Sequence, residues 1–193
     1  MPKDETSDIE RGELALLAAD TATDVRSYLE AVTTVASGTS PDVALPIVLL
    51  AVSQVLASGA RLGAIADVVP TERFEPDSGP EPDVDPLRVA LANVLDGIDD
   101  YAEIVDPMLT ADVVRGSLSG DLAAVAADLS HGLRHFENGR VDEALWWWQF
   151  SFLSSWGGPA ASALRVVLSI LAHLRLDADD EVVADAEFDA LHP

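Results

Sequence analysis

The sequence predicts an all-α protein, a single-domain bundle of about six helices. Apolar residues recur along most of the chain at the spacing of one helix face, i, i+3, i+4 and i+7. Proline or glycine separates these stretches, and no segment carries the alternating runs and tight turn of a β-hairpin. The 193 residues, 49% of them hydrophobic, suffice for one domain with a sizeable core. We expect residues 1–176 to form this domain and the acidic residues 177–193 to form a mobile tail.

The first helix is predicted from an apolar face that runs from Leu14 to Val32. A second helix should begin at Ser40-Pro41, because serine caps helices and proline is favoured in their first turn. We expect it to continue to about Asp67.

The apolar segment 43–69 is long enough to cross a bilayer, which takes roughly 20 residues. Polar side chains interrupt it at Ser53, Gln54, Ser58 and Arg61, and neither a flanking basic cluster nor an aromatic belt marks a membrane interface. We therefore expect a helix buried in the bundle and no membrane.

Residues 70–86 hold five prolines and six acidic residues, a composition that predicts an extended connector between helices two and three. Asp85-Pro86 then begins the third helix, whose apolar face is expected to extend to Ile104. A loop through residues 106–120 should lead to the last three helices. These are predicted at residues 120–137, 141–155 and 159–176, with Asn138-Gly139 and Gly157-Gly158-Pro159 as the breaks.

The chain is strongly acidic, with 34 acidic against 11 basic residues and a formal net charge of −23. A phosphate backbone would be repelled by this charge, so we expect no nucleic-acid partner. The absence of cysteine excludes disulfides and thiolate chemistry. The charged N-terminal stretch lacks the apolar core of a signal peptide, which predicts a cytoplasmic protein.

All four tryptophans lie in the stretch DEALWWWQFSFLSSWGG, residues 142–158. Successive side chains on a helix point about 100° apart, so Trp146, Trp147 and Trp148 cannot form one stacked box. Most of the rings are therefore expected in the core. A homodimer whose interface uses the tryptophans is an alternative.

Four polar residues share a stripe on the otherwise apolar sixth helix: Ser162, Arg165, Ser169 and His173. If this stripe faces inward, Arg165 must be paired, because an unpaired buried guanidinium is very costly. Glu143 on the fifth helix is the partner that we predict. The resulting site between helices five and six would bind a small anion or a protein partner. Its predicted residues are Arg165, Glu143, Trp147, Gln149, Trp156 and His173.

Two metal sites are weaker hypotheses. Asp128, His131 and His135 have a spacing that could bind Zn²⁺ or Fe²⁺ on one helix face. Asp96, Asp100 and Glu103 would share one face of the third helix, the arrangement by which helical Mg²⁺-dependent nucleotide hydrolases hold their metal. In both cases a solvated polar face explains the same pattern.

No nucleophile elbow, Walker loop, dinucleotide-binding loop or HExxH motif is present. The sequence therefore favours a non-enzymatic binding or adaptor protein without a cofactor. The Mg²⁺-dependent hydrolase and the homodimer stay as alternatives.

Two long stretches resemble one family. They are SGARLGAIADVVPTERFEPDSGPEPDVDPLR, residues 58–88, and GRVDEALWWWQFSFLSSWGGPAASALR, residues 139–165. Both are similar to the domain of unknown function 5063, found mainly in actinobacteria, over about Leu14 to Leu176. The resemblance implies a cytoplasmic bacterial protein and implies no activity.

Overall fold

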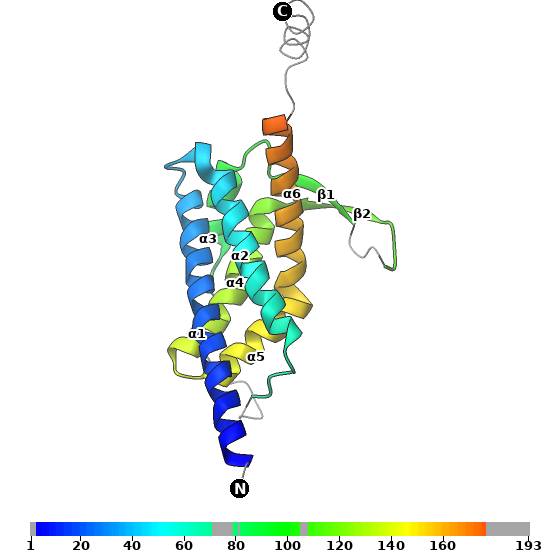
Figure 1. The fold of residues 1–193 in the computed structure, drawn as a ribbon. Helices are drawn as coiled ribbons and strands as arrows, with labels where there is room; N and C mark the ends of the chain where they lie inside the picture. Colours follow the sequence, from blue (N-terminus) through cyan, green and yellow to red (C-terminus); the bar gives the residue numbers. More distant parts are fainter. Residues whose placement is uncertain (1–2, 71–78, 81, 105–107, 177–193) are drawn as a thin grey trace, which may run out of the picture.

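The computed structural model describes residues 3–70, 79–80, 82–104 and 108–176, with only the backbone described for residues 3–10. It is mostly α-helical and forms a bundle, as predicted (Figure 1). Its elements are α1 (Lys3–Ala36), a 3₁₀ turn (Pro41–Val43), α2 (Ala44–Ala64), α3 (Asp85–Val94), β1 (Asp100–Ile104), β2 (Val113–Ser117), α4 (Leu118–Glu137), α5 (Val141–Ser151), a π-helical turn (Phe152–Trp156) and α6 (Gly157–Leu176).

One core connects the helices. α1 packs against α2 and α4, α2 packs against α6, and α4 packs against α3, α5 and α6. Tyr28 on α1 illustrates the junction with α4, because its buried hydroxyl donates to the Leu122 carbonyl at 2.9 Å. On α4, Leu122, Val125 and Leu129 lie at helical spacing and are buried in this core. Burying such aliphatic side chains stabilises the fold by about 1.5–3 kcal/mol each.

The α2 helix begins later than predicted. Residues Pro41–Val43 form a 3₁₀ turn, the Ser40 side chain caps nothing, and the α-helical part starts at Ala44. It ends at Ala64, three residues before the predicted Asp67. Most of the predicted connector and the whole of the predicted tail, residues 71–78, 81 and 177–193, lie outside the described residues.

Two helical stretches are long and apolar enough to cross a bilayer, Pro41–Ala64 and Val141–Leu176. Core helices pass the same test of length and composition, so this finding is weak evidence for a membrane. The α2 helix packs against three other helices of the bundle, α1, α5 and α6.

α5, the π-helical turn and α6 follow one another without a gap, although α5 is inclined to α6 (Figure 1), so the predicted break at Gly157-Gly158-Pro159 is wrong. The backbone widens into a π-helical turn at residues 152–156 and then continues as α-helix. Pro159 lies three residues after the π-helical turn, and the helix continues through it without a break. α6 then runs along α2 and α4.

The prediction that the chain contains no β-hairpin is also wrong. β1 and β2 pair in an antiparallel ribbon, with Asp100 opposite Ser117 and Ile104 opposite Val113. The third helix therefore ends at Val94, ten residues before the predicted Ile104. Gly97, with a φ of +83°, turns the chain into β1. This ribbon and its tip, described here at residues 100–104 and 108–117, project from the bundle beside α6 (Figure 1); we call it the hairpin arm.

Candidate functional site

The hairpin arm is anchored to the bundle at its base. The Asp99 carboxylate accepts hydrogen bonds from the backbone N–H and the hydroxyl of Ser119 on α4, both at 2.7 Å. The Tyr101 hydroxyl donates to Asp121 on α4, and Ser162 on α6 donates to Glu103. Three side chains of the arm's base are therefore tied to two helices, which fixes the direction in which the arm projects.

Tyr101, Glu103 and Asp121 form an acidic cluster at this base. The Tyr101 oxygen also lies 3.2 Å from Glu103 Oε2, but a phenol has one proton and can donate to only one carboxylate at a time. Burial raises the pKa of Asp121 to about 6; the hydrogen bond from Tyr101 opposes this, and the charges of Glu103 and Asp99 add to it. Burial, followed by the neighbouring carboxylates, raises the pKa of Tyr101 as well. Tyr101 therefore stays a neutral donor at physiological pH.

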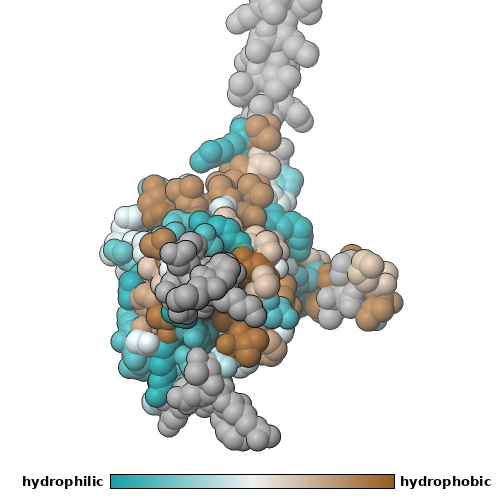
Figure 2. Space-filling model, turned by 60° about the horizontal axis from the view of Figure 1, so that its bottom comes forward, coloured by the Kyte–Doolittle hydropathy of each residue, from teal (hydrophilic) through white to brown (hydrophobic). Residues whose placement is uncertain are grey.

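The outer part of the arm exposes large apolar side chains. Met108 is 89% exposed, Leu109 85% and Val113 65%. Ile104 lies opposite Val113 on the same face of the ribbon and is 47% exposed. Figure 2 shows hydrophobic side chains on the part of the molecule that projects from the body of the protein.

Arg165 does not pair with Glu143, in contrast to the prediction. It is exposed on α6, and its guanidinium lies 5.7 Å from the centre of the Tyr101 ring. Glu143 is buried in the first turn of α5, where the helix dipole favours an acidic side chain. α6 turns its polar stripe toward the arm, so the predicted cluster between helices five and six does not form.

A cleft of about 280 Å³ lies between the arm and α6. Its walls are Ile98, Asp100, Tyr101 and Ala102 on one side and Arg165, Val166, Ser169 and Ile170 on the other. At the arm's base Asp100 is paired with Arg115 of β2, which lowers the pKa of Asp100. Arg165 and Ser169 of the predicted polar stripe thus line a cleft. The residues of its other wall were not part of the binding site predicted between helices five and six. His173 lies exposed one turn beyond Ser169 and does not line the cleft.

Two of the four tryptophans are core residues, and the other two are partly buried against the core. Trp148 is fully buried and donates to the Leu129 carbonyl at 3.1 Å, and Trp156 is 1% exposed and packs against Gly59. Trp147 is partly buried and donates to the Asp128 carbonyl at 2.9 Å. Two of the four rings are thus used inside one chain, which leaves no room for a dimer interface that uses all four.

Gln149 was predicted to line the site between helices five and six, but its side chain contacts the end of α2 and the segment that follows it. Its side chain accepts a hydrogen bond from the Val68 N–H at 2.9 Å and donates to the Leu62 carbonyl at 2.9 Å. It thereby holds residues 65–69, which follow α2, against α5. Because of this tether, the segment forms one wall of a groove.

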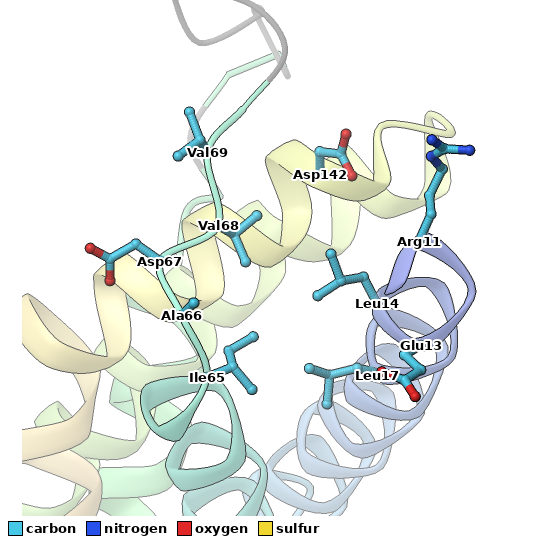
Figure 3. A pocket seen from close by; sticks show the side chains of 10 residues that line it. All are labelled: Arg11, Glu13, Leu14, Leu17, Ile65, Ala66, Asp67, Val68, Val69 and Asp142. Carbon is cyan, nitrogen blue, oxygen red and sulfur yellow. The ribbon is translucent and has the colours of Figure 1, made fainter. Parts of the chain in front are cut away.

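The groove lies between that segment and α1 and has a volume of about 680 Å³ (Figure 3). Ile65 and Val68 point across it toward Leu14 and Leu17 of α1. Charged side chains lie on its rim: Arg11, Glu13, Asp67 and Asp142. The size and the apolar lining are typical of ligand pockets.

Neither proposed metal site forms. Asp96 lies in the turn after α3, and Asp100 and Glu103 point to opposite faces of β1 because they are three residues apart on a strand. On α4, Asp128 accepts from Ser155, and the His131 ring packs 4.0 Å from the Trp147 ring. Arg134 approaches His131 Nδ1 at 3.2 Å, and His135 is fully buried. Within the described part of the chain, no three acidic or histidine side chains converge on a metal position.

The residues that the sequence analysis missed are those of the arm: Tyr101, Ile104, Met108, Leu109 and Val113. Two signals could have located it. Asp96-Gly97 is a turn dipeptide that should have ended the third helix, and Val113-Val114 is a β-branched pair followed by Gly116.

The sequence matches the family described as "Domain of unknown function (DUF5063)" over residues 13–173. The chain belongs to this family. None of the curated proteins matches it. Among solved structures, the DUF5063 chain is similar to the crystal structure of protein BF1032 from Bacteroides fragilis, with a TM-score of 0.64 and 15% sequence identity. That match covers 84% of this chain and 94% of the other, and at this identity it supports the bundle fold alone.

Proposed function

We propose that the protein is a non-enzymatic binding protein that holds a cytoplasmic protein partner through the hairpin arm. The observation that carries this proposal is the exposure of apolar side chains on a projecting, anchored ribbon. Met108 and Leu109, at 89% and 85% exposed, are the two most exposed large hydrophobic residues in the described chain.

Exposed apolar residues on a ribbon favour association with another molecule. Single exposed hydrophobic residues are common, whereas a contiguous group at the end of a projection marks an interaction surface. Within the described residues, the ribbon has only two strands, so each strand has one unpaired edge. Unpaired edges readily accept a strand from another chain.

The anchoring supports the same proposal. A loop that served only to connect α3 with α4 would not need the hydrogen bonds that Tyr101 donates to the bundle and that Glu103 and Asp99 accept from it. Holding a binding element in its bound direction reduces the entropy lost on association.

The proposal can be tested by photocrosslinking in cells. A benzophenone amino acid placed at position 109 should give one discrete adduct with a partner protein. The matched control is position 50 on α2, because Leu50 is 70% exposed but lies away from the arm. An adduct at 109 that is absent at 50 supports the proposal. Equal labelling at both positions, or no adduct at 109, contradicts it, and an adduct of twice the chain's own mass identifies a homodimer instead.

The groove favours a second candidate function, the binding of a small apolar ligand. Its apolar wall and volume of about 680 Å³ fit such a ligand. Anilinonaphthalene sulfonate should fluoresce on binding, and Leu17→Glu, which places a charge in the wall, should remove the signal. The control variant is Leu16→Glu, because Leu16 is 69% exposed on α1 and does not line the groove. Equal loss in both variants would place the dye elsewhere.

A further inference from the structure

We infer that the cleft between β1 and α6 binds an extended segment of the partner that carries a carboxylate, and that Arg165 binds this carboxylate. The inference rests on the proposed function and adds the chemistry that the partner must have. It depends on where the cleft lies, on the lack of an ion-pair partner for Arg165 among the described residues, and on the hydrogen bonds and ion pairs that the nearby acidic residues already make.

The lining of the cleft places it at the edge of β1 that, within the described residues, is not paired with a strand. Residues 100–102 of β1 line it together with α6, and no residue of β2 does. β2 occupies the other edge of β1 through the register from Asp100–Ser117 to Ile104–Val113. A peptide in extended conformation can pair its main chain with such an edge, and its side chains then reach the neighbouring wall. Here that wall is α6, with Arg165 and Ser169.

Within the described residues, Arg165 lacks the ion-pair partner that four other arginines have. Arg26, Arg61, Arg88 and Arg115 pair with Glu137, Asp24, Asp85 and Asp100, respectively. Within the described residues, Arg165 makes no ion pair, although the chain has 34 acidic residues. Its guanidinium instead lies over the Tyr101 ring, which keeps it at the cleft. The planar guanidinium fork matches a carboxylate with two parallel hydrogen bonds.

The acidic residues around the cleft are already engaged. Asp100 is paired with Arg115, Glu103 accepts from Ser162, and Asp121 accepts from Tyr101. They therefore leave Arg165 available to an incoming group. The charge of −23 repels an anionic segment at long range, but salt screens this repulsion beyond about 8 Å at physiological ionic strength. A contact between Arg165 and a carboxylate is much closer than that distance.

Three synthetic peptides test the inference on the full chain. All are N-acetylated pentapeptides of alternating threonine and valine: one ends in a free carboxylate, one ends in an amide, and one ends in an amide but has aspartate at its centre. Each is titrated into ¹⁵N-labelled protein, and the amide signals of residues 98–102 and the Arg165 Nε signal are followed. We expect at least one carboxylate peptide to shift these signals and to bind about tenfold more tightly than the uncharged peptide. The free-acid and aspartate peptides distinguish a chain terminus from an acidic side chain.

Two variants complete the test. Arg165→Ala should remove the tenfold difference, whereas Arg175→Ala should keep it, because Arg175 is an exposed arginine of the same helix that does not line the cleft. Equal binding of charged and uncharged peptides, or equal loss in both variants, overturns the inference. So does a dimer in light scattering that Arg165→Ala dissociates, because a second copy would then occupy the cleft.

The two proposals fail in different ways. If the adduct at position 109 forms and is unchanged in Arg165→Ala, and no peptide shows a carboxylate preference, the arm binds a partner without using the cleft. If the peptides bind as expected but position 109 gives no adduct, the cleft inference holds and the arm is not the partner's main contact.

Discussion

Gly132 on α4 lies directly under the indole ring of Trp148 on α5. A Cβ atom at position 132 would stand 2.5 Å from Trp148 Cδ1 and closer still to Nε1. The two helices can approach this closely only because position 132 has no side chain, and the approach allows Trp148 to donate to the Leu129 carbonyl.

Gly132→Ala should destabilise the protein even though alanine favours helices. The added methyl group must displace a buried ring, and overpacking of this kind costs about 1–3 kcal/mol. Urea unfolding followed by tryptophan fluorescence measures the change. Gly12→Ala is the control, because nothing lies within 4 Å of that Cβ position in α1; it should stabilise the protein by up to about 1 kcal/mol. Equal effects at both positions would contradict the close packing described for Gly132.

Asp121→Asn should stabilise the protein at pH 7 to 8. The pKa of Asp121 is raised to about 6 in the folded protein, against about 3.9 in an unfolded chain, so folding favours its protonated form. The stability that Asp121 provides is therefore full below pH 4 and is lost as the pH rises through about 6. Asparagine cannot ionise and can still accept from Tyr101, so the variant should gain about 1–2 kcal/mol at pH 7, after allowance for partial solvent screening.

Melting temperatures of both proteins between pH 4.5 and 8 check this expectation. The advantage of Asp121→Asn should grow with pH and level off above about pH 7. Asp112→Asn removes the same charge from an exposed position near the arm's tip and serves as the control. An advantage independent of pH, or equal in the two variants, would mean that general charge repulsion is the cause.

Gln149→Leu should release the wall of the groove. Leucine keeps roughly the volume of glutamine but leaves the Val68 N–H and the Leu62 carbonyl without their partner. An unsatisfied buried polar group costs about 1–3 kcal/mol. Hydrogen exchange at the Val68 amide should accelerate at least tenfold, while Gln54→Leu, which removes an exposed hydrogen bond to Asp24, should leave it unchanged. Unaltered protection of Val68 would show that other contacts hold the segment.

Met108→Ser combined with Leu109→Ser should leave the free energy of unfolding within about 0.5 kcal/mol of the wild type, because side chains this exposed bury little apolar surface on folding. The same double variant should lose the partner adduct at a crosslinker moved to position 113. A loss of stability above 2 kcal/mol would instead show that the arm's tip is part of the folded core.

The helical bundle could be predicted from the sequence because its helices bury one face each, and burial leaves a periodic pattern. The core face of α4 is the clearest case: Leu122, Val125 and Leu129 recur at helical spacing, and all three are buried. The arm could not be predicted in this way. Its strands have five residues each and bury little, and their position depends on contacts of Asp99 and Tyr101 with distant α4. An isolated two-stranded ribbon is marginal without such contacts.

The site was predicted in part. Spacing identified the polar stripe of α6 and therefore Arg165, but a helix face does not reveal which element covers it. The predicted partner, Glu143, lies on α5. In the fold the stripe faces β1 instead, which brings Tyr101 to Arg165.

The π-helical turn at residues 152–156 sets how far α6 is rotated about its own axis relative to α5. Each residue of an α-helix advances the helix by about 100°, and a π-helical turn advances it by less per residue. If these five residues wound as ordinary α-helix, everything after them would rotate by nearly one residue step, and Arg165 would swing off the edge of β1. This single π-helical turn thus directs the side chains of α5 and α6 to two different surfaces. Asp142 of α5 lies on the rim of the groove, whereas Arg165 of α6 lines the cleft.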